Sequence, residues 1–183
     1  MSNLTIRQLA YAEHIHQQTS FPIVVLLDNV RGPNNVGGIF RIADALGVSF
    51  IALCGATPAP PNKLLRKVAR GAELHTPSQY YPDANEAIEL YKAEKYTLIA
   101  LEIATTSNDI KTLDYTQLEK IVLIAGGEKM GVSTKILEQA DLIIHIPMLG
   151  HGLSMNVANS VAIAVYEITK QWIEIKQLNN QVI

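Results

Sequence analysis

The sequence predicts an α/β fold in which a mainly parallel sheet is flanked by helices. Apolar runs of strand length alternate with helical patterns along the chain, as the crossovers of a parallel sheet require. The runs at residues 21–27 and 121–125 are apolar throughout, which is typical of strands covered on both faces. The 183 residues contain no internal repeat and no low-complexity linker, so we interpret residues 1–183 as a single domain.

Periodicity and turn-forming residues set the expected limits of the elements. Apolar residues three or four positions apart indicate helices, and clusters of glycine, proline and asparagine indicate loops. The expected elements of the first half are a helix at 5–18 within an N-terminal segment of residues 1–20, a strand at 21–27, a loop at 28–35, a helix at 36–47, a strand at 49–53 and a helix at 63–70 that Gly71 ends. Those of the second half are an acidic helix at 83–94, strands at 96–103 and 120–125 separated by a polar loop at 105–111, and a strand at 142–146 that Pro147 closes.

Charge and composition narrow the classes of protein. The formal net charge is −2, so any basic surface for nucleic acid must be local. Cys54 is the one cysteine, which excludes an internal disulfide, fits a reducing compartment and indicates a small buried residue. No apolar run resembles an N-terminal signal or reaches membrane-spanning length, so we expect a cytoplasmic location and no membrane partner. None of the five histidines has cysteine or acidic partners at metal-ligand spacing, and we expect no metal.

Arg41 is a candidate anion-binding residue in the helix at 36–47. Helical side chains lean toward the N-terminus, and Gly37 and Gly38, one turn earlier, have no side chain to obstruct Arg41. Arg41 could therefore reach the start of the helix, where unpaired backbone amides favour an anion such as phosphate. The alternative is a surface arginine paired with Asp44 or with a neighbouring loop.

A basic face is expected on the helix at 63–70. Lys63, Arg66, Lys67 and Arg70 recur at helical spacing with no acidic residue between them. Such a stripe could follow a nucleic-acid backbone. The alternative is a solvated helix face without a partner.

Two glycine-containing loops follow buried strands and are shaped for a ligand. In the loop at 126–133, Glu128 lies among three glycines, and Ser133 is expected to cap the next helix. In the second loop, Gly150 and Gly152 allow a sharp turn, and Ser154 and Asn156 are residue types that begin helices. Glu128 could hold a polar group of a substrate, or it could be a loop carboxylate in water.

The helix that follows the second loop is unusually apolar. From Val157 to Val165 only Asn159 and Ser160 are polar. A helix of this kind is buried on more than one face, which predicts packing against its own sheet and against a second subunit.

Three segments together resemble the ordered motifs of a known family. NNVGGIFRIADALGV at 34–48, IVLIAGGEKMGVS at 121–133 and IPMLGHGLSMNVANSVAIAVYE at 146–167 are similar to those of the SpoU, or TrmH-like, RNA ribose 2′-O-methyltransferases of the SPOUT superfamily. The resemblance covers about residues 22–170. It implies a C-terminal deep trefoil knot over residues 121–170, a homodimer, and S-adenosylmethionine bound in the knot. The substrate it implies is a ribose 2′-hydroxyl in tRNA or rRNA.

The resemblance also assigns roles to individual residues. The catalytic positions that it implies are Asn35, Arg41, Glu128, Ser154 and Asn156. The cofactor-contacting positions that it implies are Leu101, Gly126, Ile146 and Met155. Met155 stands where the family often has leucine, and methionine is a tolerant apolar substitute. For RNA contact we expect a surface made of Arg31, Lys63, Arg66, Lys67 and Arg70.

The chemistry leaves two roles open for Arg41. The family view makes this arginine a base that is assisted by a phosphate of the substrate. A guanidinium is protonated at physiological pH, so we interpret Arg41 first as a phosphate clamp and only conditionally as a proton acceptor. Two other functions remain as alternatives: a knotted enzyme that methylates a base, and an RNA-binding module that has lost catalysis.

Overall fold

The computed structural model describes residues 7–8 and 19–180, with side chains described up to residue 177. The helix expected at 5–18 therefore lies almost entirely outside the described residues. No helix in the described part of the chain combines the length and the apolarity needed to span a lipid bilayer.

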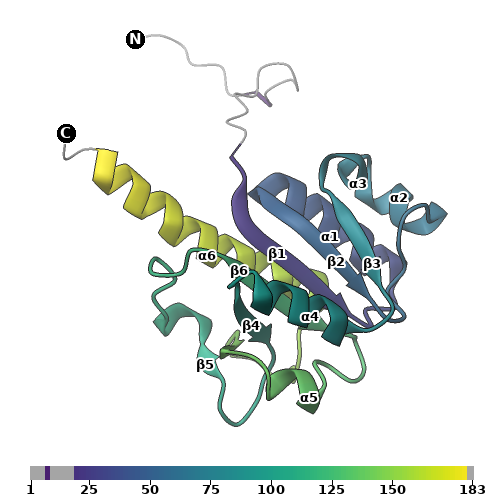
Figure 1. Cartoon of the computed structure of the whole chain (residues 1–183). Coiled ribbons are helices and arrows are strands. Elements are labelled where there is room, and N and C mark those ends of the chain that lie inside the picture. The colour runs from purple at the N-terminus through teal and green to yellow at the C-terminus, as the bar shows by residue number, and fades with distance from the viewer. Residues whose placement is uncertain (1–6, 9–18, 181–183) are drawn as a thin grey trace.

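One parallel sheet forms the centre of the molecule (Figure 1). The described residues contribute seven strands in the order β3-β2-β1-β6-β4-β7-β5, and every neighbouring pair is parallel. Their limits are β1 Phe21–Asp28, β2 Val48–Cys54, β3 Ser78–Tyr81, β4 Thr97–Leu101, β5 Asn108–Asp109, β6 Ile121–Gly126 and β7 Leu142–His145. The prediction of a mainly parallel α/β sheet is confirmed.

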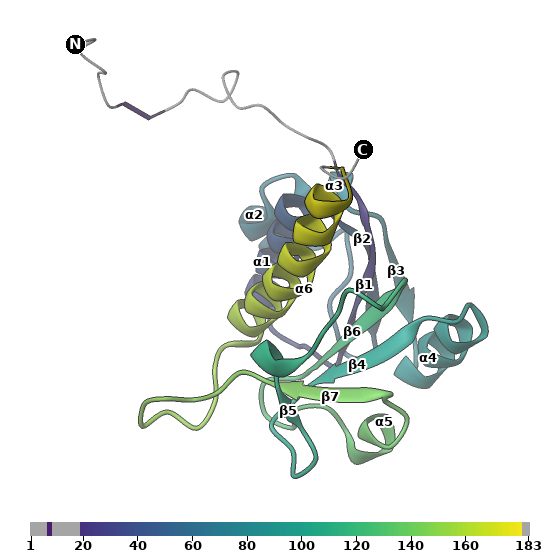
Figure 2. The ribbon, with the colours of Figure 1, turned by 90° about the vertical axis from the view of Figure 1, so that its left-hand side faces the viewer.

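Helices cover both faces of the sheet (Figure 2). The helices α1, α2, α3 and α6 lie on one side, and α4 and α5 lie on the other. Their limits are α1 Pro33–Leu46, α2 Lys63–Ala69, α3 Ala72–His75, α4 Ala84–Ala93, α5 Thr134–Leu137 and α6 Val157–Asn180, with a short 3-10 helix, η2, at Ile110–Thr112.

The inner strand β1 is apolar from Phe21 to Leu27, and burial on both faces of the sheet explains why. Ile23, Val25 and Leu27 are fully buried in the core beneath α1 and α6. Val24 and Leu26 are buried in the second core, beneath α4 and α5. Because successive side chains point to opposite faces, a strand between two layers of helices must be apolar at every position.

The sequence-based assignment missed several short elements. Neither α3 nor β3 was expected, and the loop predicted at 105–111 contains β5 and the start of η2. These elements have four residues or fewer and lie at the margins of the fold, so they carry no clear periodicity. The helix α2 ends with Arg70 in the left-handed conformation, and Gly71 precedes α3 rather than ending α2.

The helix α1 packs tightly between α2 and α6. A Cβ atom at Gly37 would lie 2.6 Å from the carbonyl oxygen of Leu65 in α2, so only glycine allows this approach. A Cβ atom at Gly38 would lie 3.6 Å from the Cβ atom of Ala158 in α6, an ordinary contact. Helix packing therefore requires glycine at position 37, a reason that the sequence did not suggest, but it does not require glycine at position 38.

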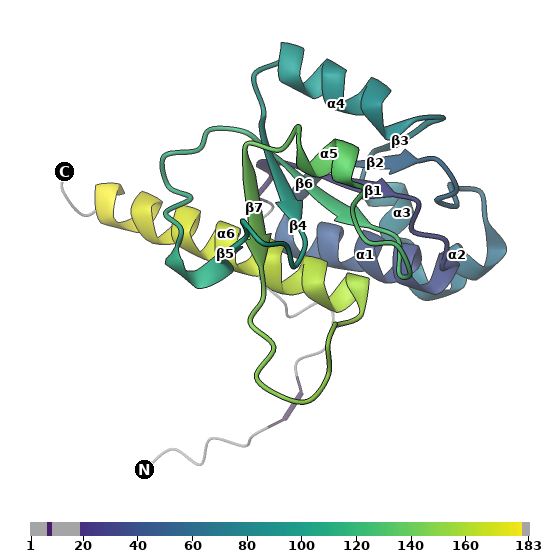
Figure 3. The ribbon, with the colours of Figure 1, turned by 90° about the horizontal axis from the view of Figure 1, so that it is seen from below.

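The long helix α6 runs beside α1 under the sheet (Figure 3). Its inner face, which includes Val161, Val165 and Ile168, is fully buried. Its outer face is partly exposed within one chain, with Ile163 at 40% and Tyr166 at 59% of full exposure. Burial on a second face, as the sequence predicted, is thus not provided by the described residues of a single chain.

Candidate functional site

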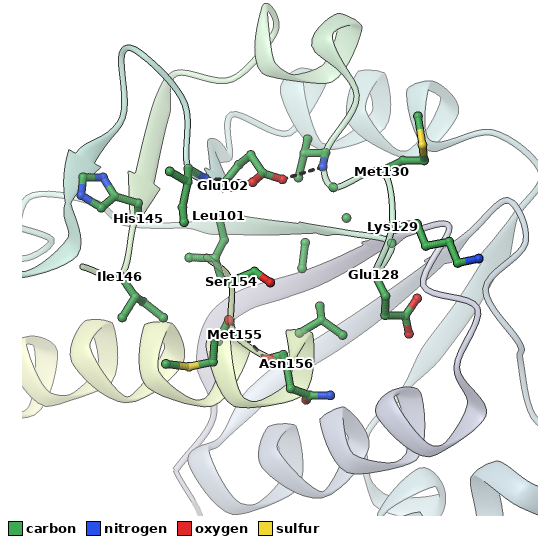
Figure 4. Close-up of a pocket in the computed structure, with 18 of the residues that line it drawn as sticks. Leu101, Glu102, Glu128, Lys129, Met130, His145, Ile146, Ser154, Met155 and Asn156 are labelled. Carbon is green, nitrogen blue, oxygen red and sulfur yellow. Dashed lines mark hydrogen bonds between the residues drawn. The ribbon is translucent and has the colours of Figure 1, made fainter. Parts of the chain in front are cut away.

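A cavity lies at the carboxyl ends of β4, β6 and β7 (Figure 4). Its volume is about 630 Å³, within the range of about 300–1,000 Å³ that is typical of small-molecule sites. Three segments that are distant in sequence form its walls: 101–103, 125–132 and 145–160 in part. Parallel strands end at the same edge of a sheet, and this topology brings the three segments together.

The loop after β6 depends on glycine. A Cβ atom at Gly126 would collide with the backbone of Gly131, so the two ends of the loop can approach only because Gly126 has no side chain. The amide of Gly131 donates to the carbonyl oxygen of Gly127 over 2.8 Å and closes the turn. The closed loop lines the cavity with Glu128, Lys129 and the residues that follow them up to Val132.

Glu128 joins this loop to the start of α1. Its Oε1 atom accepts hydrogen bonds from the side-chain amide of Asn35, over 2.6 Å, and from the backbone amide of Gly32, over 3.2 Å. Burial alone would raise the pKa of Glu128, but hydrogen bonds from its own amide, from Asn35 and from Gly32 outweigh it. The net result is a pKa below the ordinary value, so the side chain is a carboxylate at neutral pH.

Asn156 continues the same hydrogen-bonded chain into α6. Its Oδ1 atom accepts from the amides of Ala158, over 3.0 Å, and Asn159, over 3.3 Å, so Asn156 caps the helix as the sequence predicted. Its Nδ2 atom donates to Oδ1 of Asn35 over 2.9 Å.

The helix cap fixes the direction of every hydrogen bond in this chain. Because Oδ1 of Asn156 faces the helix amides, its NH₂ group must face Asn35. Asn35 then accepts at Oδ1 and donates at Nδ2, which leaves Glu128 as the final acceptor. Three residues up to 121 positions apart thus form one polarised unit beside the cavity.

The four expected cofactor positions also meet at this cavity. Leu101, Gly126, Ile146 and Met155 all line it. Ser154 lines it as well, and its side chain is exposed in the described structure. The cavity therefore combines apolar side chains with carboxylates and a side-chain amide, which suits a ligand with both apolar and polar parts.

Comparison with known proteins identifies the family. The model of the SpoU rRNA Methylase family matches residues 22–166. The chain belongs to this family. A tRNA (guanosine(18)-2′-O)-methyltransferase of Thermus thermophilus is 31% identical over 159 residues, which are 87% of this chain and 80% of the relative. The 23S rRNA (guanosine(2553)-2′-O)-methyltransferase RlmP of Bacillus subtilis is 32% identical over 145 residues, 79% of this chain and 57% of that relative.

Solved structures agree with this assignment. The AdoMet-bound rRNA methyltransferase from Sinorhizobium meliloti matches with a TM-score of 0.77 and 29% identity, over 85% of this chain and 58% of that one. The A. aeolicus TrmH/SpoU tRNA modifying enzyme matches with a TM-score of 0.78 and 28% identity, over 87% of this chain and 79% of that one. The chain thus spans most of some relatives and little more than half of others.

In this SpoU family chain, Arg41 lies outside the cavity. Its side chain is exposed on α1, and it makes no hydrogen bond or ion pair with the rest of the described chain. The pairing with Asp44 that the sequence left open is absent, since Asp44 instead lies 3.7 Å from Nδ1 of His75. The guanidinium is therefore available to an external anion.

The basic stripe on α2 is exposed, but one of its four cations pairs with an acidic residue. Lys63, Lys67 and Arg70 make no ion pair with other described residues. Arg66 lies 3.5 Å from Glu73, whose side chain is only 4% exposed. The sequence shows no acidic residue within the stripe, but folding brings Glu73 of α3 to it. Arg31 is also exposed, just before α1.

The structure adds residues that the sequence reasoning missed and corrects one that it proposed. Glu102, which directly follows β4, and His145, the last residue of β7, both line the cavity. The signal for Glu102 is a carboxylate that follows an apolar run without an intervening turn. Ser133 precedes α5 as expected, but its side chain makes no capping hydrogen bond. Among the described residues, no group of three or more histidine, cysteine or acidic side chains could hold a metal ion.

Proposed function

We propose that this chain transfers a methyl group from S-adenosylmethionine to a ribose 2′-hydroxyl in tRNA or rRNA. The observation that carries the proposal is the polarised unit of Asn156, Asn35 and Glu128 beside a cavity lined by the family's cofactor positions. Family membership and relatives named as ribose methyltransferases of tRNA and rRNA support it. The cofactor is supported by the AdoMet-bound relative from Sinorhizobium meliloti.

The residues of the cavity fit this cofactor. The volume of about 630 Å³ is large enough for a bent nucleoside with an amino-acid tail, by the usual size of small-molecule sites. When bound, the cofactor supplies a methyl group on a positively charged sulfur. Leu101, Ile146 and Met155 give the cavity an apolar side, which favours a transition state in which that charge disappears.

The reaction forms an oxygen–methyl bond and breaks the sulfur–methyl bond, so the cofactor would leave as a neutral thioether and the hydroxyl proton would pass to water. Methyl transfer is an in-line displacement, so most of the rate gain comes from holding the hydroxyl in place. We assign that role to Asn35, Ser154 and Asn156, together with the Glu128 carboxylate as a hydrogen-bond acceptor. Arg41, which is outside the cavity and free of partners in the described chain, would clamp a phosphate of the RNA.

RNA contact beyond the reacting nucleotide is assigned to exposed cations. Lys63, Lys67 and Arg70 on α2 face solvent without acidic partners among the described residues, and Arg31 lies before α1. Arg66 contributes less, because Glu73 offsets its charge. Binding to phosphates through these residues should fall steeply with salt.

A homodimer and a C-terminal knot belong to the same proposal. The outer face of α6 exposes Ile163 and Tyr166, and the loop between β7 and α6 exposes Leu149 at 93% and Leu153 at 90%. Large apolar side chains exposed together are typical of an interface, and a second copy of this chain is the occupant that the family implies. The knot over residues 121–170 and a cytoplasmic location rest on the family resemblance and on the RNA substrate. Light scattering of the purified protein tests the dimer.

A titration followed by a transfer assay tests the function. We expect the protein to bind S-adenosylmethionine and to label RNA from the methyl-labelled cofactor. Arg41→Ala should abolish transfer while cofactor binding stays nearly intact, because Arg41 does not line the cavity. Lys92→Ala is the matched control, since Lys92 is a cation of α4 on the opposite side of the sheet. Absence of cofactor binding, or full activity of Arg41→Ala, would contradict the assignment.

A further inference from the structure

Glu102 is a cavity residue that the proposed reaction does not use. It directly follows β4, and its backbone amide donates to the carbonyl oxygen of Ile144 in β7 over 2.9 Å. Its carboxylate lines the cavity at a place separate from Glu128 (Figure 4). It takes no part in the hydrogen-bonded chain of Asn156, Asn35 and Glu128.

Two backbone amides hold the Glu102 carboxylate in place. Oε1 accepts from the amide of Ile103, and Oε2 accepts from the amide of Val132, each over 2.9 Å. A carboxylate has about four acceptor positions, so each oxygen keeps acceptor capacity. No cation pairs with Glu102 within the described chain. The side chain is thus fixed in orientation and is still able to accept hydrogen bonds.

The opposite loop is shaped around this carboxylate. Gly131 has a φ angle of +63°, which favours glycine, and a Cβ atom there would collide with Oε2 of Glu102. The loop therefore leaves space for the carboxylate only because residue 131 is glycine. A carboxylate that two amides hold on the wall of a ligand-sized cavity is better explained by contact with a ligand than by contact with water alone.

We propose that Glu102 selects the cofactor by accepting hydrogen bonds from the two vicinal hydroxyls of its ribose. This inference rests on the proposed function, because it assumes that the cavity binds S-adenosylmethionine. Two adjacent oxygens with free acceptor positions match two adjacent hydroxyl donors. An acidic side chain that binds a ribose beside the carboxyl ends of parallel strands is a recurrent solution for nucleotides. The carboxylate accepts but cannot donate, so a sugar without hydroxyls gains nothing from it.

The test compares two ligands on the same protein. The probes are S-adenosylhomocysteine and its 2′,3′-dideoxy analogue, and the measurement is the dissociation constant by calorimetric titration. The native protein should bind the ribose form about tenfold or more tightly than the dideoxy form, because hydrogen bonds to a charged group are worth at least that factor. E102Q should reduce the ratio to about threefold or less, on the same scale. E128Q, a matched change in the same cavity, should keep the native ratio.

The outcomes separate this inference from the proposed function. The ratio of two constants within one variant does not depend on the fraction of folded protein, so a destabilised E102Q remains informative. Equal weakening of both ligands by E102Q, with the ratio unchanged, would show that Glu102 only clamps the loop. Loss of the ratio in E128Q as well would show a general charge effect. If the native protein bound neither ligand, the proposed function itself would fail.

Discussion

Asn156 has two separable roles, and two substitutions distinguish them. Its Oδ1 atom caps α6, and its Nδ2 atom orients Asn35 and through it Glu128. Asn156→Ala removes both roles. Asn156→Asp keeps an acceptor for the helix amides but removes the donor to Asn35. The structure therefore predicts that the two variants differ in stability but not in their loss of catalysis.

The expected stability changes follow from the contacts. Asn156→Ala loses the cap, which costs about 1 kcal/mol, and the hydrogen bond to Asn35, which costs about 0.5–1.5 kcal/mol, so its Tm should fall by about 3–10 °C for a chain of this size. In Asn156→Asp the cap remains, and a negative charge at the start of a helix gains about 0.3–1 kcal/mol. The lost hydrogen bond to Asn35 costs about 0.5–1.5 kcal/mol. These two terms nearly cancel, so Asn156→Asp should unfold close to the native Tm.

The expected catalytic changes follow from the direction of the hydrogen bonds. Without a donor from position 156, Oδ1 of Asn35 loses its partner, and in Asn156→Asp it faces a second acceptor instead, so Asn35 shifts and no longer holds Glu128 in place. Misplacement of a positioning group costs about 10- to 100-fold in rate. We therefore expect a fall of about that size in both variants, and no better activity in Asn156→Asp than in Asn156→Ala. Thermal unfolding and a methyl-transfer assay on the same preparations measure both effects.

Two results would refute this reasoning. If Asn156→Asp kept full turnover, the contact with Asn35 would have no catalytic role, and Asn156 would be a helix cap only. If Asn156→Asp lost as much stability as Asn156→Ala, the described capping geometry would not persist in solution.

Three further predictions concern charge and ionisation. Changing Lys63 and Lys67 to glutamate should weaken RNA binding and should make the slope of log affinity against log salt shallower by the equivalent of about two phosphate contacts. Unchanged affinity in a filter-binding assay would exclude this surface. The pKa of Glu128 is lowered from 4.5, so its stabilising effect should be full above about pH 4.5 and be lost as the pH falls through the lower value. The stability difference between the native protein and Glu128→Gln should accordingly shrink in acid, and a constant difference down to about pH 2 would contradict it. Burial, followed by the charges of Asp28, Asp83 and Glu86, raises the pKa of Cys54 to about 12, so alkylation at pH 8 should be slow until the protein unfolds.

The sheet could be predicted from the sequence because its long inner strands are marked by local runs of apolar residues. The apolar run of β1 from Phe21 to Leu27 is long, and burial on both faces of the sheet favours apolar residues at successive positions. The missed elements α3, β3 and β5 depend instead on pairing and packing with neighbours. In β3, for example, four residues pair only with β2 at the edge of the described sheet. No period in the sequence records such contacts.

The site could be predicted only in part, for the same reason. Residue types at 128 and 156 indicated a carboxylate and a helix cap, but their bridge through Asn35 joins positions 93 and 121 residues apart. Reasoning along one helix assigned Gly37 to the path of Arg41, because it could not foresee the backbone of α2 against that glycine. The role of Glu102 likewise appears only when β4 and the loop at 126–132 lie together.

The function that we propose for this chain is delivery of a methyl group to a ribose hydroxyl of RNA. The most direct measurement incubates the purified protein with total tRNA and rRNA and methyl-labelled cofactor, digests the RNA to nucleosides and identifies the labelled species by mass spectrometry. We expect label on 2′-O-methylribose. Label on a base, or cofactor binding with no label in RNA, would contradict it.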